Sequence, residues 1–261
     1  MLEFPTIFLS HGSPMLALQD SPARRFLQGL GASLGRPAAI LAVSAHWETR
    51  GGAAVSLARQ PETIHDFGGF PRALFEIQYP APGAPEAAER AAALIEASGP
   101  QVGRSLDRGL DHGAWVPLSL MYPEADIPVA QLSVMQGAGP AEHEQLGRAL
   151  TALRAEGVLV IGSGALTHNL GEFRGQGIDA PVPHWVSEFE AWMKSRLEAG
   201  ERAALLDYRR LAPFGARNHP SEEHLLPLYV AMGAAGPEAK TVQLHSSFEH
   251  GVLAMDAYAF H

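Results

Sequence analysis

The sequence contains no cysteine, which excludes a disulfide framework, a thiolate nucleophile and cysteine-ligated zinc or iron–sulfur sites. It also lacks long apolar runs, because the two longest, Ala38–Ala45 and Gly157–Leu166, are far shorter than the roughly 18 residues of a membrane span. Basic residues number 19 against 28 acidic ones, and the net charge of −9 disfavours binding of a polyanion. We therefore expect neither nucleic acid nor a membrane as a partner.

The composition is that of a folded protein with a substantial core. The chain has 261 residues, of which 46% are hydrophobic and 18% charged, so it is neither too short nor too polar to bury a core. No composition shift marks a boundary, and we expect one domain over residues 1–261. The first residues show no basic segment followed by an apolar block and a cleavage site, so a cytoplasmic location is expected. No heptad seam or interaction tail is present, and the sequence indicates no oligomeric state.

Short apolar runs alternate with helical patterns along the chain. The runs bounded by turn residues predict buried strands at Thr6–Ser10, Ala38–Ser44, Ile127–Val134, Val158–Gly162 and Thr241–His245, with weaker candidates at Ala53–Leu57 and Val252–Phe260. Periodicity with terminal Pro and Gly predicts helices at Pro85–Ala97, Pro140–Ala155, Pro183–Ala199 and Ser221–Ala235. This alternation predicts an α/β fold, with helices on both faces of a mostly parallel or mixed central sheet.

Histidine is abundant, and its positions are more informative than its number of 12. His11 and His46 follow the first two predicted strands, and His168 follows the strand at 158–162. If these strands run parallel, their carboxyl ends share one edge of the sheet, where open α/β sheets bind ligands. The sequence thus predicts a cluster of imidazoles there, the alternative being three unrelated loop histidines.

Two further histidines are candidates for the same place. His224 lies in the predicted first turn of a helix that Ser221 would cap, and His112 lies in a predicted Gly-flanked loop beside Asp111. His65 and His245 are weaker candidates, and His245 would reach the same edge at the end of its strand. Ordinary structural roles are expected for His184, His219, His250 and His261, and His143 is expected to be solvated on a charged helix.

Common catalytic motifs are absent from the sequence. The turn Gly162–Gly164 lacks the third glycine of a dinucleotide-binding motif, and Ser163 lacks the first glycine of a nucleophile elbow. An imidazole cluster with open coordination positions instead suits zinc, which activates water for hydrolysis, or iron(II), which binds O2 and a chelating substrate. The usual iron triad needs a carboxylate, here Glu223, Glu222 or Glu48, although an all-histidine set is equally compatible. A zinc hydrolase and a non-enzymatic metal-binding protein both stay open on this reasoning.

An ordered set of motifs resembles the 4,5-DOPA extradiol dioxygenase family, which belongs to the class III, LigB-type extradiol ring-opening dioxygenases. The set spans nearly the whole chain and comprises HGSP (11–14), SAHWE (44–48), IHDFGGFP (64–71), YPAPG (79–83), LDHGAWVPL (110–118), GSGALTHNL (162–170) and EEHLLPLYVAMGAAG (222–236). No single motif is decisive, but their order is specific. The resemblance implies cleavage of a DOPA-like catechol by O2 next to its diol, with a muconic semialdehyde as the product.

The resemblance also implies the site residues. His11, His46 and His224 would hold iron(II) for activity, or zinc as a plausible bound metal. His168 would be the acid/base, and a fourth ligand when zinc is bound, while His112 would contact substrate or oxygen. Better-known LigB enzymes have glutamate as the third ligand, but adjacent helical residues point about 100° apart, and His224 is preferred over Glu223.

The sequence also offers residues for a substrate pocket. Aromatic walls are predicted from Trp47, Phe67, Phe70 and Trp115, and Arg217 is a candidate partner for a substrate carboxylate. Ordinary core packing is the competing interpretation of each aromatic residue. The particular catechol stays open among DOPA, caffeate-like and protocatechuate-like compounds.

Overall fold

Eight strands form a mixed central sheet in a computed structural model that describes residues 3–261. The strand order is β4-β3-β5-β2-β6-β1-β10-β7, and β5, β2, β6 and β1 run parallel as adjacent neighbours. The bounds are β1 Thr6–Ser10, β2 Ala39–Thr49, β3 Ala54–Ser56, β4 Gly103–Ser105, β5 Val129–Met135, β6 Val158–Gly164, β7 Thr241–His245 and β10 Ala257–Phe260. A separate hairpin pairs β8 (Phe248–Glu249) with β9 (Leu253–Ala254).

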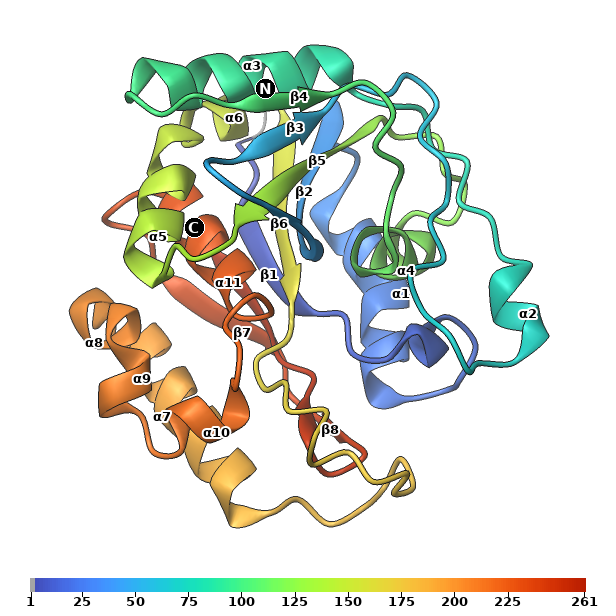
Figure 1. Cartoon of the computed structure of the whole chain (residues 1–261), viewed down its shortest axis with the longest axis vertical. Helices are drawn as coiled ribbons and strands as arrows, with labels where there is room; N and C mark the ends of the chain where they lie inside the picture. Colours follow the sequence, from blue (N-terminus) through green and yellow to red (C-terminus); the bar gives the residue numbers. More distant parts are fainter. Residues whose placement is uncertain (1–2) are drawn as a thin grey trace.

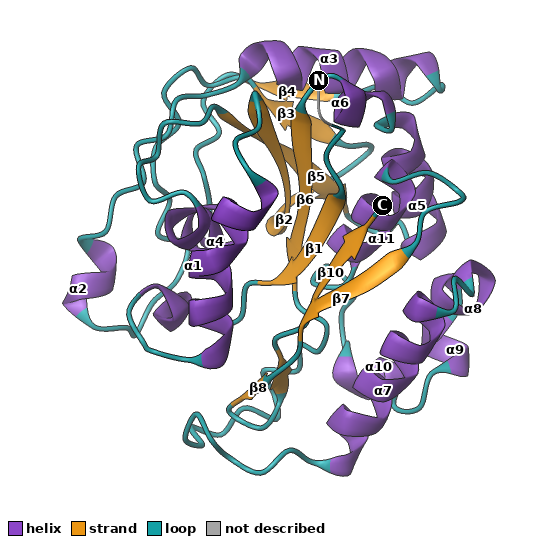
Figure 2. Ribbon diagram, turned by 180° about the vertical axis from the view of Figure 1, so that it is seen from behind, coloured by secondary structure: helices purple, strands orange, loops and turns teal. Residues whose placement is uncertain are grey.

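Helices cover both faces of the sheet (Figure 1; Figure 2). One face carries α3 (Pro85–Ala97), α5 (Pro140–Ala149), α6 (Ala152–Ala155) and α11 (Leu226–Ala234), and the other carries α1 (Pro22–Leu34), α4 (His112–Met121) and the 3-10 helix η1 (Pro14–Ala17). The remaining helices are α2 (Arg72–Phe75), α7 (His184–Glu198), α8 (Arg202–Leu206), α9 (Tyr208–Leu211) and α10 (Gly215–Asn218). No helix within residues 3–261 is long and apolar enough to cross a membrane.

The parallel strands are apolar on both faces because each face packs against helices. Along β2, Leu41 and Val43 belong to the core under α3, while Ile40 and Ala42 belong to the core under α1 and α4. All four are buried, so the strand reads as a continuous apolar run in the sequence. The predicted single α/β domain with a mixed sheet is confirmed.

Several predicted boundaries need correction. The helix expected at Ser221–Ala235 begins at Leu226, and residues 221–225 form turns, so Ser221 does not cap it. The predicted helix Pro140–Ala155 divides into α5 and α6, and the candidate strand at 252–260 divides into β9 and β10. His112 is not in a loop but is the first residue of α4, which Asp111 caps through the Ala114 amide.

Helix α1 was not predicted, although the sequence signals its start. Ser21 caps it by accepting a hydrogen bond from the Arg24 amide, and Pro22 follows as its first residue. Helix α4 gives no such periodic signal, because nine of its ten residues are buried and its pattern is apolar all round.

Two glycines of β6 let α11 and the segment before it approach the sheet closely. A Cβ atom on Gly162 would collide with the carbonyl oxygen of Pro227, and one on Gly164 would collide with that of His224. These are backbone atoms inside a packed layer, so they cannot turn aside as a flexible side chain does. The two glycines therefore set how near the backbone of His224 comes to the sheet.

We expect Gly162→Ala to lower the free energy of unfolding by about 1–3 kcal/mol, the usual cost of overpacking a core. Urea denaturation followed by circular dichroism measures it. The control is Gly29→Ala at an exposed position of α1, where a Cβ atom meets nothing within 4 Å. This change should stabilise the helix by about 0.5–1 kcal/mol. An unchanged unfolding midpoint in the Gly162 variant would contradict the close packing of α11 on β6.

Candidate active site

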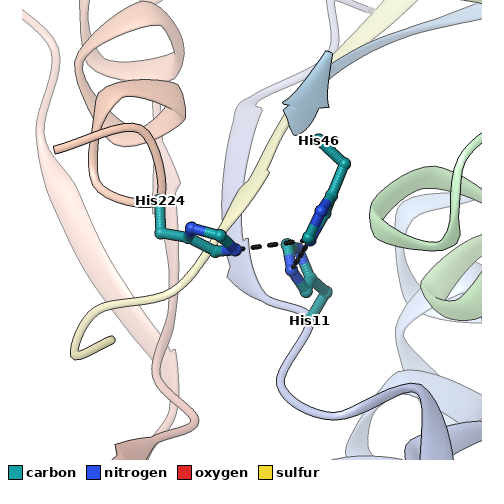
Figure 3. A group of neighbouring side chains, drawn as sticks. All are labelled: His11, His46 and His224. Carbon is teal, nitrogen blue, oxygen red and sulfur yellow. Dashed lines mark hydrogen bonds between the residues drawn. The ribbon is translucent and has the colours of Figure 1, made fainter. Parts of the chain in front are cut away.

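Three imidazoles converge at the carboxyl edge of the parallel strands. His11 directly follows β1, and His46 lies on β2 where the register against β5 shifts between Ser44 and Glu48. His224 comes from the turn that precedes α11 (Figure 3). The His46 Nε2 atom lies 3.0 Å from the His11 Nε2 atom and 3.3 Å from the His224 Nε2 atom. The predicted convergence at this edge is therefore present in the structure.

Partners on the outer ring nitrogens orient the His11 and His224 rings. The hydroxyl of Ser163 donates to the Gly113 carbonyl, so its lone pair accepts a hydrogen bond from the His11 Nδ1–H at 3.0 Å. The Glu223 carboxylate accepts from the His224 Nδ1–H at 2.8 Å. Both Nε2 atoms are then unprotonated and direct their lone pairs toward the centre of the cluster.

Burial keeps these imidazoles uncharged. It holds the pKa of His11 and of His224 well below the usual value, and the neighbouring imidazoles lower both further. Burial and the nearby His112 lower the pKa of His46 to about 4. Neutral imidazole is the form that binds metals, so the set is in its ligating state at neutral pH.

The three Nε2 atoms could hold one metal ion. Metal–nitrogen bonds of about 2.0–2.1 Å place two ligands of a tetrahedral site about 3.3 Å apart, close to the distances seen here. All three ligating atoms lie within 4.8 Å of one another. The donor set and its spacing therefore fit a small divalent ion bound by three histidines.

His112 and His168 flank this cluster. The His112 ring centre lies 3.9 Å from that of His46, and the His168 ring stacks on His224 with the ring centres 3.4 Å apart. Among the described residues, the ligand atoms of His168 group with those of Glu223 and His224 but form no such group with His11 and His46. Burial lowers the pKa of His168, so this imidazole is neutral and can accept a proton.

Asp66 belongs to the site, and the sequence reasoning did not select it. Its Oδ1 atom accepts hydrogen bonds from the His112 ring Nδ1 at 2.8 Å and from the His112 amide at 3.1 Å. Its Oδ2 atom faces the His46 Nδ1 atom at 3.6 Å. Although burial alone would raise its pKa, the hydrogen bonds from His112 outweigh burial and lower the pKa of Asp66 to about 2. The sequence did offer a signal for Asp66, because it is an acidic residue inside the motif IHDFGGFP (64–71), beside a histidine and two phenylalanines.

A second buried carboxylate supports the backbone beside His46. Asp111 accepts hydrogen bonds from Ser44 at 2.6 Å and from both Gln131 and Arg108 at 2.7 Å. Ser44 in turn accepts from the His46 amide. These bonds compensate the charge of a side chain that has no solvent exposure, and they fix the irregular part of β2 that carries His46.

A cavity of about 380 Å³ opens beside the imidazoles. His11, His46, His112, His168 and His224 all line it. Phe67 and Phe70 line it as predicted, and their rings meet edge to face with centres 5.5 Å apart. His250, expected to have a structural role, also lines the cavity, and its Nδ1 bonds the Gln176 carbonyl.

Three predicted pocket residues lie elsewhere. Trp115 is fully buried and donates to the Ile64 carbonyl, so it packs in the core behind Phe67. Trp47 lies under the Arg108 guanidinium and does not line the cavity. Arg217 pairs with Glu172 at 2.8 Å and stacks over Trp185, so its charge is already compensated outside the cavity. The prediction of Arg217 as a carboxylate partner is not supported by this placement.

The alternative carboxylate ligands lie in a second, more open groove that also reaches His46 and His224. Glu48, Glu222 and Glu223 line this groove, and burial together with the Glu223 charge raises the pKa of Glu48. In the described residues, only Glu223 of these three falls in a group with histidine ligand atoms, namely those of His168 and His224. The structure thus brings Glu223 to His224 as a hydrogen-bond partner.

Four other histidines have structural contacts outside the cluster. His143 was expected in solvent but is buried, because its Nε2 atom accepts the Met135 amide hydrogen and so joins α5 to the end of β5. His219 is buried against the Leu166 carbonyl, and His65 bonds the Ile77 carbonyl. His245 stacks on Phe26 rather than reaching the cluster.

Fold and site together define an α/β enzyme with a histidine-lined centre at the carboxyl edge of its sheet, next to a pocket with aromatic walls. Residues 5–260 match the family described as the catalytic LigB subunit of aromatic ring-opening dioxygenase. The chain belongs to this family, and the resemblance predicted from its motifs is confirmed.

Two known relatives align with this sequence over nearly the whole chain. The chain is 44% identical to a protein of Beta vulgaris and 43% identical to one of Escherichia coli K12, both named 4,5-DOPA dioxygenase extradiol. The alignments cover 98% and 96% of this chain, and 96% and 92% of the relatives. The crystal structure of an uncharacterized E. coli K12 protein, JW3007, superposes with a TM-score of 0.83 at 34% identity, covering 99% of this chain and 100% of that one.

We expect Asp66→Ala to lower ring-opening turnover by about 10–100-fold, the usual cost of losing a partner that orients a site histidine. Asp66→Asn should recover part of this loss, because its amide oxygen can still accept from the His112 ring. Steady-state oxygen uptake measures both variants, with Asp179→Ala on an exposed loop as the control. Equal losses in the Ala and Asn variants would contradict an orienting hydrogen bond.

Proposed function

We propose that this protein cleaves the ring of a catechol next to its diol with O2, in the extradiol (meta) sense, and releases a muconic semialdehyde. The observation that carries this proposal is the convergence of three neutral imidazoles beside a cavity lined by three further histidines and three phenylalanines. The names of the relatives, 4,5-DOPA dioxygenase extradiol, support this type of cleavage.

In this proposal His11, His46 and His224 bind one metal ion, iron(II) in the active enzyme, with zinc as a competing occupant. Bound iron(II) would supply open coordination positions for both catechol oxygens and for O2, and a route for electrons between them. Zinc lies above iron(II) in the affinity series and is not redox-active, so a zinc-loaded sample would be inactive.

His168 would act as the general base toward a catechol hydroxyl. It lines the cavity, and its lowered pKa leaves it neutral and able to accept the proton at neutral pH. After cleavage the same imidazole would return the proton to the product. His112 is held by Asp66 through Nδ1, which leaves its Nε2 atom as a hydrogen-bond partner for substrate or oxygen.

The aromatic walls would orient the ring and exclude water. Phe67 and Phe70 present an edge-to-face pair to the cavity, and an aromatic substrate gains from both contacts. Displacing water from this space would also protect the reactive site from side reactions.

The experiment that tests the function compares metals on the same protein. Apo-protein is loaded anaerobically with Fe(II) or with Zn(II), and each sample receives a panel of catechols in air-saturated buffer. We expect oxygen uptake and a yellow product with iron and neither with zinc. If the iron form consumes no oxygen with any catechol of the panel, and the zinc form hydrolyses an ester or an amide, the protein is a zinc hydrolase and this proposal is wrong.

We expect His224→Ala to abolish stoichiometric metal binding, because two imidazoles cannot replace a three-ligand set. Metal content after desalting, measured by plasma emission spectroscopy, checks this expectation. The control is His184→Ala, since His184 is exposed at the start of α7 and away from the cluster. One bound metal ion per chain in the His224 variant would show that the ligand set is wrong.

We expect His168→Ala to reduce turnover by roughly 10²–10⁴-fold, the usual contribution of a general acid–base group. Substrate affinity should change little, because the metal ligands and the aromatic walls remain. Rapid-mixing measurements of binding and of oxygen uptake separate the two quantities. Near-normal turnover would remove His168 from the acid/base role.

A further inference from the structure

Three polar side chains line the cavity besides the five clustered histidines, namely Ser13, Asp66 and His250. Asp66 is already engaged by His112, and the Ser13 hydroxyl accepts a hydrogen bond from the Met15 amide. His250 differs from both, because its Nε2 atom makes no hydrogen bond within residues 3–261. This ring nitrogen is therefore the polar atom of the outer wall that is left for a ligand.

The His250 ring is fixed in one orientation and one tautomer. Its Nδ1 atom lies 2.9 Å from the Gln176 carbonyl oxygen, which can only accept, so Nδ1 carries the hydrogen. A neutral imidazole has a single N–H, so its Nε2 atom has a free lone pair. The Phe173 ring packs edge-on against this imidazole, with the ring centres 5.1 Å apart. The cavity thus contains an oriented hydrogen-bond acceptor that the imidazole cluster does not use.

The backbone of His250 is held in an uncommon conformation. Its φ angle is 52°, in the left-handed region that few residues other than glycine adopt. Within residues 3–261, three non-glycine residues have a positive φ, and only His250 of these lines the cavity. Its amide donates to the Ile178 carbonyl at 2.8 Å, which holds the turn in place. Backbone strain that the surroundings maintain in this way is typical of positions that contact a ligand.

The hairpin that carries His250 is tied to the loop that carries His168. Thr167 is fully buried, and its hydroxyl donates to the Val252 carbonyl at 2.9 Å and accepts from the Ala254 amide at 2.7 Å. In Figure 1 the β8 hairpin lies beside this loop, which follows β6. Because Thr167 directly precedes His168, one residue positions the hairpin relative to the proposed general base.

We propose that His250 determines substrate specificity: its Nε2 atom accepts a hydrogen bond from an N–H group, such as an ammonium, on the ring substituent of the catechol. This proposal rests on the function proposed above. With the diol at the clustered histidines, the substituent extends toward the outer wall, where His250 offers the free acceptor. Within residues 3–261 no lysine or arginine lines the cavity, so no such side chain opposes an ammonium there. A hydrogen bond from a charged donor raises affinity by about 10–100-fold.

The test is titration calorimetry on zinc-loaded protein, which binds catechols without oxidising them. Dopamine and 4-propylcatechol form the matched pair, because they differ only in an ammonium against a methyl group at the end of the same chain. We expect His250→Asn to weaken dopamine binding by at least about tenfold and to leave 4-propylcatechol within about twofold. Asparagine tolerates a positive φ and can still donate to the Gln176 carbonyl, but it is too short to present an acceptor where Nε2 lies.

A second variant and a control separate recognition from a structural role. His250→Gln should recover part of the dopamine affinity, since its longer side chain brings an amide oxygen near the Nε2 position. The control is His184→Asn, an exposed histidine that does not line the cavity, and it should leave both ligands unaffected. Unchanged dopamine binding in His250→Asn, or equal losses for dopamine and 4-propylcatechol, would overturn the proposal.

A third ligand tests the charge state that His250 recognises. The carboxylate 3-(3,4-dihydroxyphenyl)propanoate has no N–H group, so its affinity should not fall in His250→Asn. A loss confined to this ligand would show that the imidazole binds anions as a cation, and it would overturn the assignment of Nε2 as an acceptor.

Turnover by the iron-loaded protein separates this proposal from the proposed function. We expect His250→Asn to lower kcat/KM for dopamine and to spare 4-propylcatechol. Selective loss of dopamine binding in a protein that cleaves no catechol would reject the dioxygenase function and keep His250 as the amine acceptor. Ring cleavage in which the variant keeps the wild-type preference between the two ligands would keep the function and reject the role of His250.

Discussion

The site depends on three buried imidazoles whose Nε2 atoms lie in 3.0–3.3 Å contacts around His46. In a flexible chain each of these rings would be free to turn away from the others. Ser163 and Glu223 prevent this for His11 and His224 by fixing their outer nitrogens, and burial prevents protonation. The fold therefore orients the ligand nitrogens through their outer partners, which is how a protein scaffold pre-organises a metal site.

This arrangement depends in turn on the close packing of α11 against β6. Gly162 and Gly164 remove the side chains that would keep the Pro227 and His224 backbone away from the sheet. On the other face, α4 places His112 at its first residue, and Asp111 caps it while also supporting Ser44 beneath His46. Both layers of helices thus deliver a histidine to the same edge, one from each face.

Sequence reasoning predicted this edge because strand ends are local and parallel strands share a direction. It selected His11, His46, His112, His168 and His224, which the structure gathers around one cavity. It failed where burial depends on distant partners. The sequence predicts a solvated His143 on a charged helix, yet His143 forms a hydrogen bond with the end of β5. It predicts a structural role for His250, yet His250 lines the cavity. Arg217 was predicted as a partner for a substrate carboxylate, but it pairs with Glu172. Because Glu172 lies 45 residues earlier, no local pattern signals this ion pair.

The sequence by itself determined the α/β class, the approximate positions of the main strands along the chain and the residues that could carry the chemistry, because periodicity and turn residues act over a few positions. Tertiary structure decided which side chains meet. It assigned Asp66 to His112, buried Trp115 in the core, and paired Arg217 with Glu172 outside the cavity. These outcomes follow from contacts between residues far apart in the chain, and such contacts leave no local pattern to read.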